Sequence, residues 1–292
     1  MDATVVSAAD SGYYHLLKGL VLSLRAQPGS AKLPITVLDV GLAPDEVAWL
    51  ERERCELIGV DRIAETLPPL PDRNDGKPKL SLAQRLRPHI PALVPGRKIY
   101  LWMDADLWLQ RDGVLSYYLK AAERGRCAIV PEMHVAYPSM FSAGQYAGMF
   151  KTYERLFDRD TAKALAQNPT LNSGCFALAA SAPHWKLWAD TLEALLRRDT
   201  FYYGEQFALN HVLYARKKEA PSLFLPAGFN WICHQALPVV DAKSGLLLEP
   251  TPPHAPLGIV HLTVGAKAGE KDLRSTDGGT VRRSLKFRCG DY

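Results

Sequence analysis

Residues 98–106 read KIYLWMDAD, and this stretch decides the fold. The run 98–103 is mostly large and apolar, which is typical of a strand buried on both faces of a sheet. Two aspartates one residue apart, Asp104 and Asp106, follow it directly. Open α/β sheets bind their ligands just beyond the carboxyl ends of the strands. The sequence therefore predicts a ligand site at this pair.

The segments before this strand alternate between strand and helix patterns. Residues 4–9, TVVSAA, read as a strand, and 13–25 carry a helical stripe of leucine and valine. A second strand is expected at 34–40, a short helix at 45–52 and a third strand at 56–60. This alternation predicts an α/β fold with a mostly parallel central sheet flanked by helices.

The segments after the strand continue the mixture of helices and strands, and we find no repeat and no clear linker between domains. A proline-rich loop is expected at 68–78, and the region 223–256 is turn-rich and irregular. Further helices are expected at 79–93 (bent at its prolines), after Asp112, and at 142–157, 183–197 and 205–215, with strands at 127–130, 170–179 and 258–262, the last one expected.

Composition narrows the class of protein. The 292 residues are 47% hydrophobic and 23% charged, as in an ordinary soluble globular protein. A net charge of +4 is too small for a nucleic-acid binder. No apolar run is long enough to span a bilayer, and the first residues lack the basic start of a secretion signal. We therefore expect a cytoplasmic protein.

The cysteines and the C-terminal charges add two expectations. The five cysteines are far apart and form no CxxC pair, so we expect buried free thiols rather than disulfides or a zinc site. Residues 274–288 carry five lysines and arginines against one aspartate. We favour a solvated basic tail; the alternative is contact with an anionic acceptor or an anionic membrane surface, which would make the protein peripheral to the inner membrane.

The aspartate pair suits a metal ion. Two carboxylates beyond one strand can share a hard divalent cation, and the same cation could neutralise a diphosphate. The alternative is that Asp104 and Asp106 serve as turn formers or helix caps. We favour the metal because two carboxylates buried near a sheet edge without a counter-ion are costly.

Three further signals lie at the boundaries of elements. The stretch 8–13, AADSGY, could place an acid against the imide nitrogen of a pyrimidine and an aromatic ring against its face; the alternative is an N-cap and a packed tyrosine. His261 ends a strand and precedes Gly265 and Lys267, which suits a metal ligand and a phosphate contact, or else a core histidine and a solvated lysine. The stretches 172–174, NSG, and 204–206, GEQ, suit contacts with sugar hydroxyls, or else a bulge and a helix start.

These signals occur in this order from about Val5 to Lys267, and together they resemble glycosyltransferase family 8. The resemblance implies a GT-A fold, that of the nucleotide-diphospho-sugar transferases. It implies a retaining hexosyltransferase that moves a sugar from a UDP-sugar to a glycan or another hydroxyl acceptor, with Mn²⁺ or Mg²⁺. Residues 1–267 would form one catalytic domain, with a nucleotide-binding half at 1–110 and an acceptor-binding half at 111–267, and 268–292 would form the basic tail.

The resemblance also assigns roles residue by residue. The metal ligands would be Asp104, Asp106 and His261. The catalytic residues would be Gln206, Glu205 and Asn172. The donor-binding residues would be Ala8, Asp10, Tyr13, Arg85, Asp104, Ala105, Asp106, Gly265 and Lys267.

Three positions depart from the family pattern. Glu205 and Phe207 replace its two aspartates, and Val264 stands where glycine is usual. Two retaining routes remain open: attack by Glu205 or Gln206, or entry of the acceptor on the face that the leaving group vacates. We prefer the second, since an amide is a feeble nucleophile. Two other functions also remain open: a sugar-phosphate nucleotidyltransferase, and a non-catalytic carbohydrate- or partner-binding relative.

Overall fold

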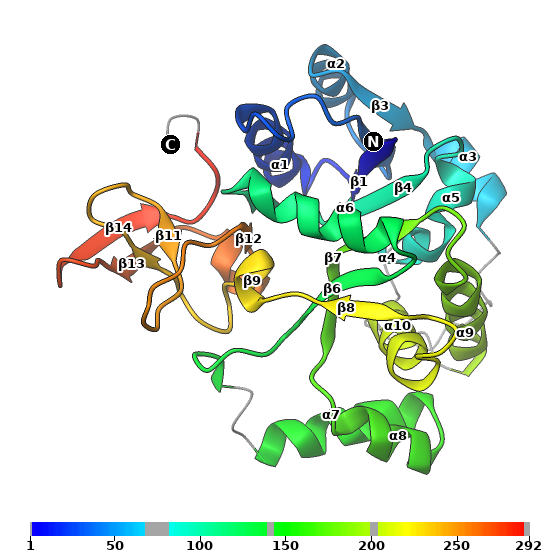
Figure 1. Cartoon of the computed structure of the whole chain (residues 1–292). Helices are drawn as coiled ribbons and strands as arrows, with labels where there is room; N and C mark the ends of the chain where they lie inside the picture. The colour runs from blue at the N-terminus through cyan, green and yellow to red at the C-terminus, as the bar shows by residue number, and fades with distance from the viewer. Residues whose placement is uncertain (1, 68–81, 139–142, 199–203, 289–292) are drawn as a thin grey trace.

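A seven-stranded sheet forms the centre of the computed structural model, which describes residues 2–67, 82–138, 143–198 and 204–288 (Figure 1). Its order is β3-β2-β1-β4-β7-β6-β8, and the pairs are parallel except that β7 runs antiparallel to both of its neighbours. The predicted mostly parallel central sheet is confirmed. The strands are β1 (Ala3–Ala9), β2 (Ile35–Asp39), β3 (Cys55–Ile58), β4 (Ile99–Met103), β6 (Cys127–Pro131), β7 (Leu171–Ala179) and β8 (Ser222–Phe224).

Helices cover both faces of this sheet because the inner strands are apolar on both sides. In β4, Leu101 packs with the helices of one face and Trp102 with those of the other. The first face is covered by α1 (Tyr14–Ala26), α2 (Pro44–Arg52) and α6 (Leu115–Glu123). The second is covered by α3 (Val60–Thr66), α4 (Leu82–Leu86), α5 (Ile90–Leu93), α7 (Ala143–Leu156), α8 (Arg159–Ala166), α9 (His184–Arg198) and α10 (Gly204–Ala215).

A small second sheet joins the end of β4 to the C-terminal part of the chain. It consists of β5 (Leu107–Leu109), β12 (Ile259–His261) and β9 (Trp231–Ile232), in the order β5-β12-β9. β5 begins immediately after Asp106, and β12 pairs with it so that His261 lies opposite Leu107. The amide of Leu262 also donates to the carbonyl of Asp106 at 2.9 Å. This pairing brings His261 beside the two aspartates although they are far apart in sequence.

A bulge in β7 shapes the same edge of the central sheet. The register with β6 shifts between Ile129, which pairs with Phe176, and Val130, which pairs with Asn172. The segment 173–175 is therefore extra on the β7 side, and such an irregularity bends a strand and redirects its side chains. The NSG stretch is thus a bulge, and it lies next to the end of β4, where Met103 pairs with Cys175.

The C-terminal part differs from the expectation that the strand at 258–262 is the last. β13 (Glu270–Arg274) and β14 (Thr280–Ser284) follow it as an antiparallel hairpin, drawn in orange and red in Figure 1. Leu273 and Leu285 are buried there, so two leucines between charged residues anchor a segment whose composition suggested a solvated tail.

Short elements account for most of the remaining differences. The strands β10 (Val239–Val240) and β11 (Leu247–Leu248) pair within the region expected to be irregular. α3 and α8 were not expected, because one or two turns leave little periodicity in a sequence. The 3₁₀ turns are η1 (Arg87–His89), η2 (Asp112–Val114), η4 (Ala227–Phe229) and η5 (Val264–Lys267).

Other expectations concern segments without regular structure. The predicted loop at 68–78 lies outside the described residues. Four of the five cysteines are buried free thiols, as expected, and Cys289 lies outside the described residues. Within the described parts of the chain, every helix is too short or too polar to cross a bilayer.

Candidate metal and donor site

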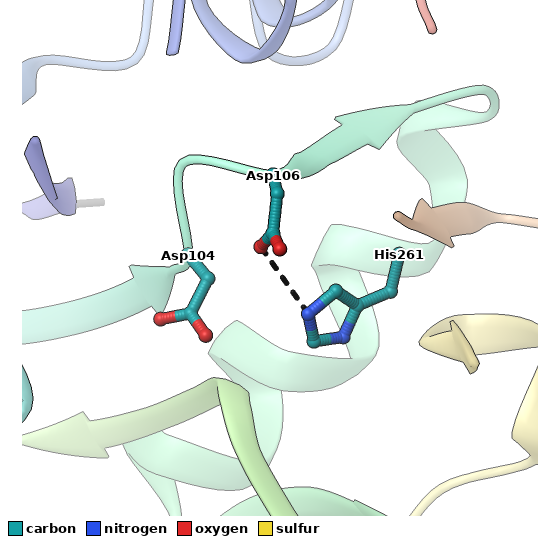
Figure 2. A group of neighbouring side chains, drawn as sticks. All are labelled: Asp104, Asp106 and His261. Carbon is teal, nitrogen blue, oxygen red and sulfur yellow. Dashed lines mark ion pairs between the residues drawn. The ribbon is translucent and has the colours of Figure 1, made fainter. Parts of the chain in front are cut away.

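Asp104, Asp106 and His261 point into one space beyond the end of β4 (Figure 2). One ligand atom from each residue lies within 4.8 Å of the other two. His261 Nε2 is 3.3 Å from Asp106 Oδ1, and both side chains are almost fully buried. The loop after β4 supplies the two carboxylates and β12 supplies the imidazole, as the strand pairing requires.

Asp104 divides its carboxylate between two environments. Its Oδ1 accepts hydrogen bonds from Arg87 at 2.5 Å and from the Trp102 indole at 2.7 Å. Its Oδ2 lies on the side of Gly174, 2.9 Å from where a β-carbon on that glycine would be. Since Trp102 and Asp104 are two residues apart on an extended backbone, they share one face of the strand. One oxygen is thus held by fixed donors, and the other faces the space near His261.

Arg87 connects Asp104 to a carboxylate deeper in the protein. Its guanidinium donates to Glu205 Oε2 at 2.5 Å and to Ser173 Oγ at 2.9 Å, and Glu205 has no exposed surface. Burial alone would lower the pKa of Arg87, but Asp104 and Glu205 raise it above its ordinary value. Burial raises the pKa of Glu205 to about 7, although the charge of Arg87 opposes that rise. Arg87 therefore stays charged and holds two acids.

His261 has a neutral partner on its other nitrogen. Nδ1 lies 3.0 Å from Asn230 Oδ1, and Asn230 Nδ2 donates to Asn172 Oδ1 at 3.0 Å. Asn172 Nδ2 in turn donates to Glu132 Oε1 at 2.7 Å. A partner of this kind fixes the orientation of a metal-binding histidine ring.

Gly174 provides the space in which these groups meet. A β-carbon there would lie 2.6 Å from His261 Cε1 and 2.8 Å from Asn172 Oδ1, besides its contact with Asp104. Distances under 3.0 Å mean overlap, and the neighbours are short side chains held by other bonds. The glycine is therefore required by close approach, and the NSG bulge is part of the site.

Lys267 closes the opposite side of the site. Its Nζ lies 2.7 Å from Asp106 Oδ2 and 2.9 Å from the Tyr13 hydroxyl, with the ammonium 4.5 Å from the centre of the tyrosine ring. Burial alone would raise the pKa of Asp106, but the His261 ring and the Lys267 ammonium outweigh it and lower the pKa to about 2. Asp106 is therefore ionised at neutral pH.

The AADSGY stretch at residues 8–13 shows features of both alternatives that its sequence left open. Tyr13 is 43% exposed and contacts Lys267, so the AADSGY turn does reach the site. Asp10 Oδ1 accepts from the Tyr13 amide at 3.0 Å, which is the capping alternative. These two roles are compatible, since a capping carboxylate keeps a second oxygen. Ala8 is buried near the end of β1, and Ala105 is buried in the turn between β4 and β5.

The turn that carries Lys267 has an unusual backbone. Val264 has a φ of +49°, in the left-handed region that a β-branched residue rarely adopts. The backbone at this position therefore keeps the conformation that a glycine would adopt without strain, although the glycine, Gly265, comes one residue later. Val264 is 69% exposed, so burial of its side chain does not compensate for the strain.

Gln206 lies beside Ser173 at the start of α10. Its Oε1 accepts from the Ser173 amide at 3.1 Å and lies 3.2 Å from the Ser173 hydroxyl. Gln206 is half-buried, whereas Glu205 beside it is enclosed and bound to Arg87. The half-buried amide is thus the more accessible of the two.

Sequence reasoning missed three residues of this site: Arg87, Trp102 and Glu132. The donor-binding role expected for Arg85 stays a prediction, and the arginine that contacts Asp104 is Arg87, two residues further on. Arg85 is half-buried on α4, and burial lowers its pKa. The strand alternation that pairs Trp102 with Asp104 was a usable signal. Nothing in the sequence marks Glu132, which simply follows β6.

The three grouped ligand atoms fit a divalent cation. Two carboxylate oxygens and one imidazole nitrogen are a ligand set that a divalent cation can use. The free Oδ2 of Asp104, the glycine that leaves room beside it and the partner on His261 Nδ1 are all features of a prepared metal site.

The sequence matches no protein-family profile and no curated protein sequence. Solved structures are similar in fold. The galactosyltransferase LgtC, solved with donor and acceptor sugar analogs, superposes with a TM-score of 0.56 at 15% identity, covering 90% of this chain and 88% of LgtC. The bifunctional glycosyltransferase WbbM gives 0.57 at 16%, covering 90% and 46%. The glycosyltransferase GlyE of Streptococcus pneumoniae TIGR4 gives 0.52 at 18%, covering 91% and 55%.

The chain has a GT-A glycosyltransferase fold. Identities of 15–18% establish the fold alone, so the chemistry has to be argued from this chain's own residues.

Proposed function

We propose that this protein is a metal-dependent glycosyltransferase that moves a hexose from a UDP-sugar to a hydroxyl group of a glycan or another acceptor. One observation carries the proposal: Asp104, Asp106 and His261 bring three ligand atoms within 4.8 Å of one another at the end of the central strand. A GT-A fold raises the expectation for glycosyl transfer, and the grouped ligands supply a reason in this chain's own chemistry.

The proposed metal ligands are Asp104 Oδ2, Asp106 and His261 Nε2. When bound there, Mn²⁺ or Mg²⁺ would act as a Lewis acid that stabilises the negative charge of a departing diphosphate. Arg87 and Trp102 hold the other oxygen of Asp104, so this carboxylate keeps one orientation. A ligand set that is oriented in advance needs no rearrangement when the donor binds.

The proposed donor contacts lie on the Lys267 side. Lys267 would exchange its present contact with Asp106 for the diphosphate, whose growing charge an ammonium offsets. Tyr13 offers a partly exposed ring beside it, suited to stacking on a uracil. Asp10 keeps one carboxylate oxygen free of the Tyr13 amide for the imide N–H of that base.

The proposed sugar contact is Gln206. Its amide would stabilise the positive charge that develops at the anomeric carbon, while the acceptor enters on the face that the diphosphate leaves, which retains the configuration. We do not assign attack to Glu205, because its carboxylate has no exposed surface and is bound to Arg87. A covalent sugar adduct on Glu205, found by mass spectrometry, would replace this route with a double displacement.

Calorimetry with UDP and Mn²⁺ tests the metal assignment. Loss of a residue that hydrogen-bonds to a metal ligand typically weakens metal binding by roughly 10–100-fold. Asp104→Asn and Asp106→Asn alter the ligands themselves, so we expect each to weaken UDP binding by more than that. Asp45→Asn, at an exposed acid in the first turn of α2, is the matched control and should leave affinity unchanged. Equal affinities for all four proteins would refute the metal assignment.

A second assay separates the reaction classes. We expect slow, Mn²⁺-dependent hydrolysis of a UDP-sugar when no acceptor is present. Release of pyrophosphate from a nucleoside triphosphate and a sugar phosphate would instead identify a nucleotidyltransferase. UDP-sugar binding without any turnover would identify a binding protein on the same fold.

A further inference from the structure

We propose that Asn230 and Asn172 fix the tautomer of His261, with its proton on Nδ1 and its lone pair on Nε2. They act as positioning residues, and their importance for metal binding rests on the proposed function above. A ring nitrogen binds a metal only when it carries no proton, so the tautomer decides whether His261 can be a ligand.

The backbone amide of Gly174 sets the direction of the chain of hydrogen bonds. A backbone N–H can only donate, and this one lies 3.0 Å from Asn172 Oδ1. The atom that it meets must therefore be the carbonyl oxygen of the side-chain amide and not its nitrogen. Asparagine amides are oriented from such contacts, and here the contact leaves one choice.

The same oxygen fixes Asn230. It lies 3.0 Å from the amide of Asn230, which must present its NH₂ group to an oxygen. The remaining atom of Asn230 is then its carbonyl oxygen, 3.0 Å from His261 Nδ1. Since that oxygen can only accept, Nδ1 must carry the proton, and a neutral ring then has a bare Nε2.

The other end of the chain is fixed in the same sense. Once the oxygen of Asn172 faces Gly174, its NH₂ group faces Glu132, whose Oε1 accepts at 2.7 Å. The Gly174 amide can only donate, and the Glu132 carboxyl oxygen accepts. Both contacts therefore require the same orientation of the Asn172 side chain.

Burial makes this orientation hard to change. Asn230 is fully enclosed, His261 is 3% exposed and Asn172 is 7% exposed. Water can therefore hardly replace a lost partner, and reversing one amide would set an oxygen against an oxygen at 3.0 Å. A buried polar group without a partner costs about 1–3 kcal/mol. Nε2 lies 3.3 Å from Asp106, on the side where the carboxylates gather, so a doubly protonated ring donates to Asp106 there and a neutral ring offers its lone pair to a cation.

Nuclear magnetic resonance of the metal-free, donor-free protein tests the proposal directly. The chain has eight histidines, so ¹⁵N-labelled histidine gives few signals, and His261→Ala identifies the one of interest. Long-range ¹H–¹⁵N spectra at a pH where the ring is neutral should show a protonated Nδ1 and a bare Nε2. A neutral ring with the proton on Nε2 would overturn the proposal.

Three variants separate positioning from packing. Asn230→Leu keeps the volume and removes the acceptor, so we expect the Nδ1 proton to be lost from a share of the molecules and Mn²⁺ to bind about 10–100-fold more weakly. Asn230→Asp keeps an oxygen against Nδ1, so it should keep the tautomer and most of the affinity, while its second oxygen faces the Asn172 oxygen and lowers the stability of the fold. Asn210→Leu removes another fully buried amide, one that bonds to Leu171 and Gln206, and should leave both readouts unchanged.

The affinity is measured with Mn²⁺ alone. Its binding is monitored by the loss of the electron paramagnetic resonance signal of the free ion. If Asn230→Leu and Asn230→Asp lose equal affinity while the tautomer stays the same, Asn230 is only a packing residue and the proposal fails. The tautomer is read without metal or donor. A failed glycosyltransferase assay would therefore leave this result intact, and a wrong tautomer would leave the glycosyltransferase proposal standing.

Discussion

The two sides of the candidate metal site are held by different chemistry. On one side Asp104 is bound by Arg87, which also binds the buried Glu205, so charges dominate. On the other side His261 is bound by Asn230 and Asn172, which are neutral amides. Both sides meet at Gly174, where a β-carbon would touch Asp104, His261 and Asn172 at once.

The difference matches what each ligand needs. A carboxylate is symmetric, so its partners have to fix its charge and the oxygen that remains free. An imidazole has two distinct nitrogens, so its partner has to fix which one carries the proton. Asn230 offers Nδ1 a carbonyl oxygen, which can only accept, and this contact places the proton on Nδ1.

The largest expected effect comes from breaking the charged side. Arg87→Leu leaves Glu205 buried without its cation, and breaking a buried ion pair costs about 3–5 kcal/mol. Asn230→Leu, on the amide side, leaves neutral groups without partners and should cost only about 1–3 kcal/mol. Urea denaturation of the metal-free proteins measures both free energies of unfolding.

A double variant sharpens that comparison. In Arg87→Leu with Glu205→Gln, the unpaired charge is gone, so we expect part of the lost stability to return. Equal losses for Arg87→Leu and Asn230→Leu, or no recovery in the double variant, would show that packing rather than charge determines the cost on both sides.

The charged side also shows how far the sequence could lead. The strand 98–103 and the aspartates after it were found because a buried strand is a continuous apolar run, and the sheet it predicts is confirmed. The grouping of His261 with them was one of two interpretations of a histidine at a strand end, and the resemblance to a family implied it. The pairing of β12 with β5, which produces it, leaves no local signal, because each strand is only three residues long.

The arginine was harder to place. Arg85 and Arg87 lie in one short stretch, QRLR, and composition does not tell them apart. Arg87 reaches the site because the helix tightens into the 3₁₀ turn η1 at that residue, just before Pro88. Glu132 and the amide chain could not be predicted, since their roles depend on which atom of each amide faces which neighbour.

Gly174→Ala changes the point where the two sides meet, and we expect it to have the next largest effect on stability. The added carbon would lie 2.6 Å from His261 Cε1 and 2.9 Å from Asp104 Oδ2, so both ligands have to move. Overpacking of this kind costs about 1–3 kcal/mol of stability. We also expect Mn²⁺ affinity to fall at least as far as in Asn230→Leu, because both sides are displaced at once.

Calorimetric melting and Mn²⁺ titration of the same samples measure the two quantities. Gly59→Ala is the control, since a β-carbon there meets nothing within 4 Å and the backbone has an ordinary negative φ. Unchanged Mn²⁺ affinity in Gly174→Ala would mean that Asp104 and His261 do not depend on the space beside Gly174. The two sides of the site would then be independent of each other.

The smallest expected effect concerns pH, and it comes from Glu205 on the charged side. Burial raises the pKa of Glu205 from 4.5 to about 7. Between those values the folded protein keeps a proton that the unfolded chain releases, so this group's contribution to stability is present below about pH 4.5 and is lost as the pH rises through about 7. Glu205→Gln removes that contribution.

Free energies of unfolding at several pH values between 4.5 and 7.5, measured without metal, check this sign. Other groups titrate in both proteins, so the informative quantity is the difference between wild type and Glu205→Gln, with wild type losing stability relative to the variant as the pH rises. The opposite trend would mean that Arg87 keeps Glu205 ionised throughout, because the attraction of the pair then exceeds the cost of burial.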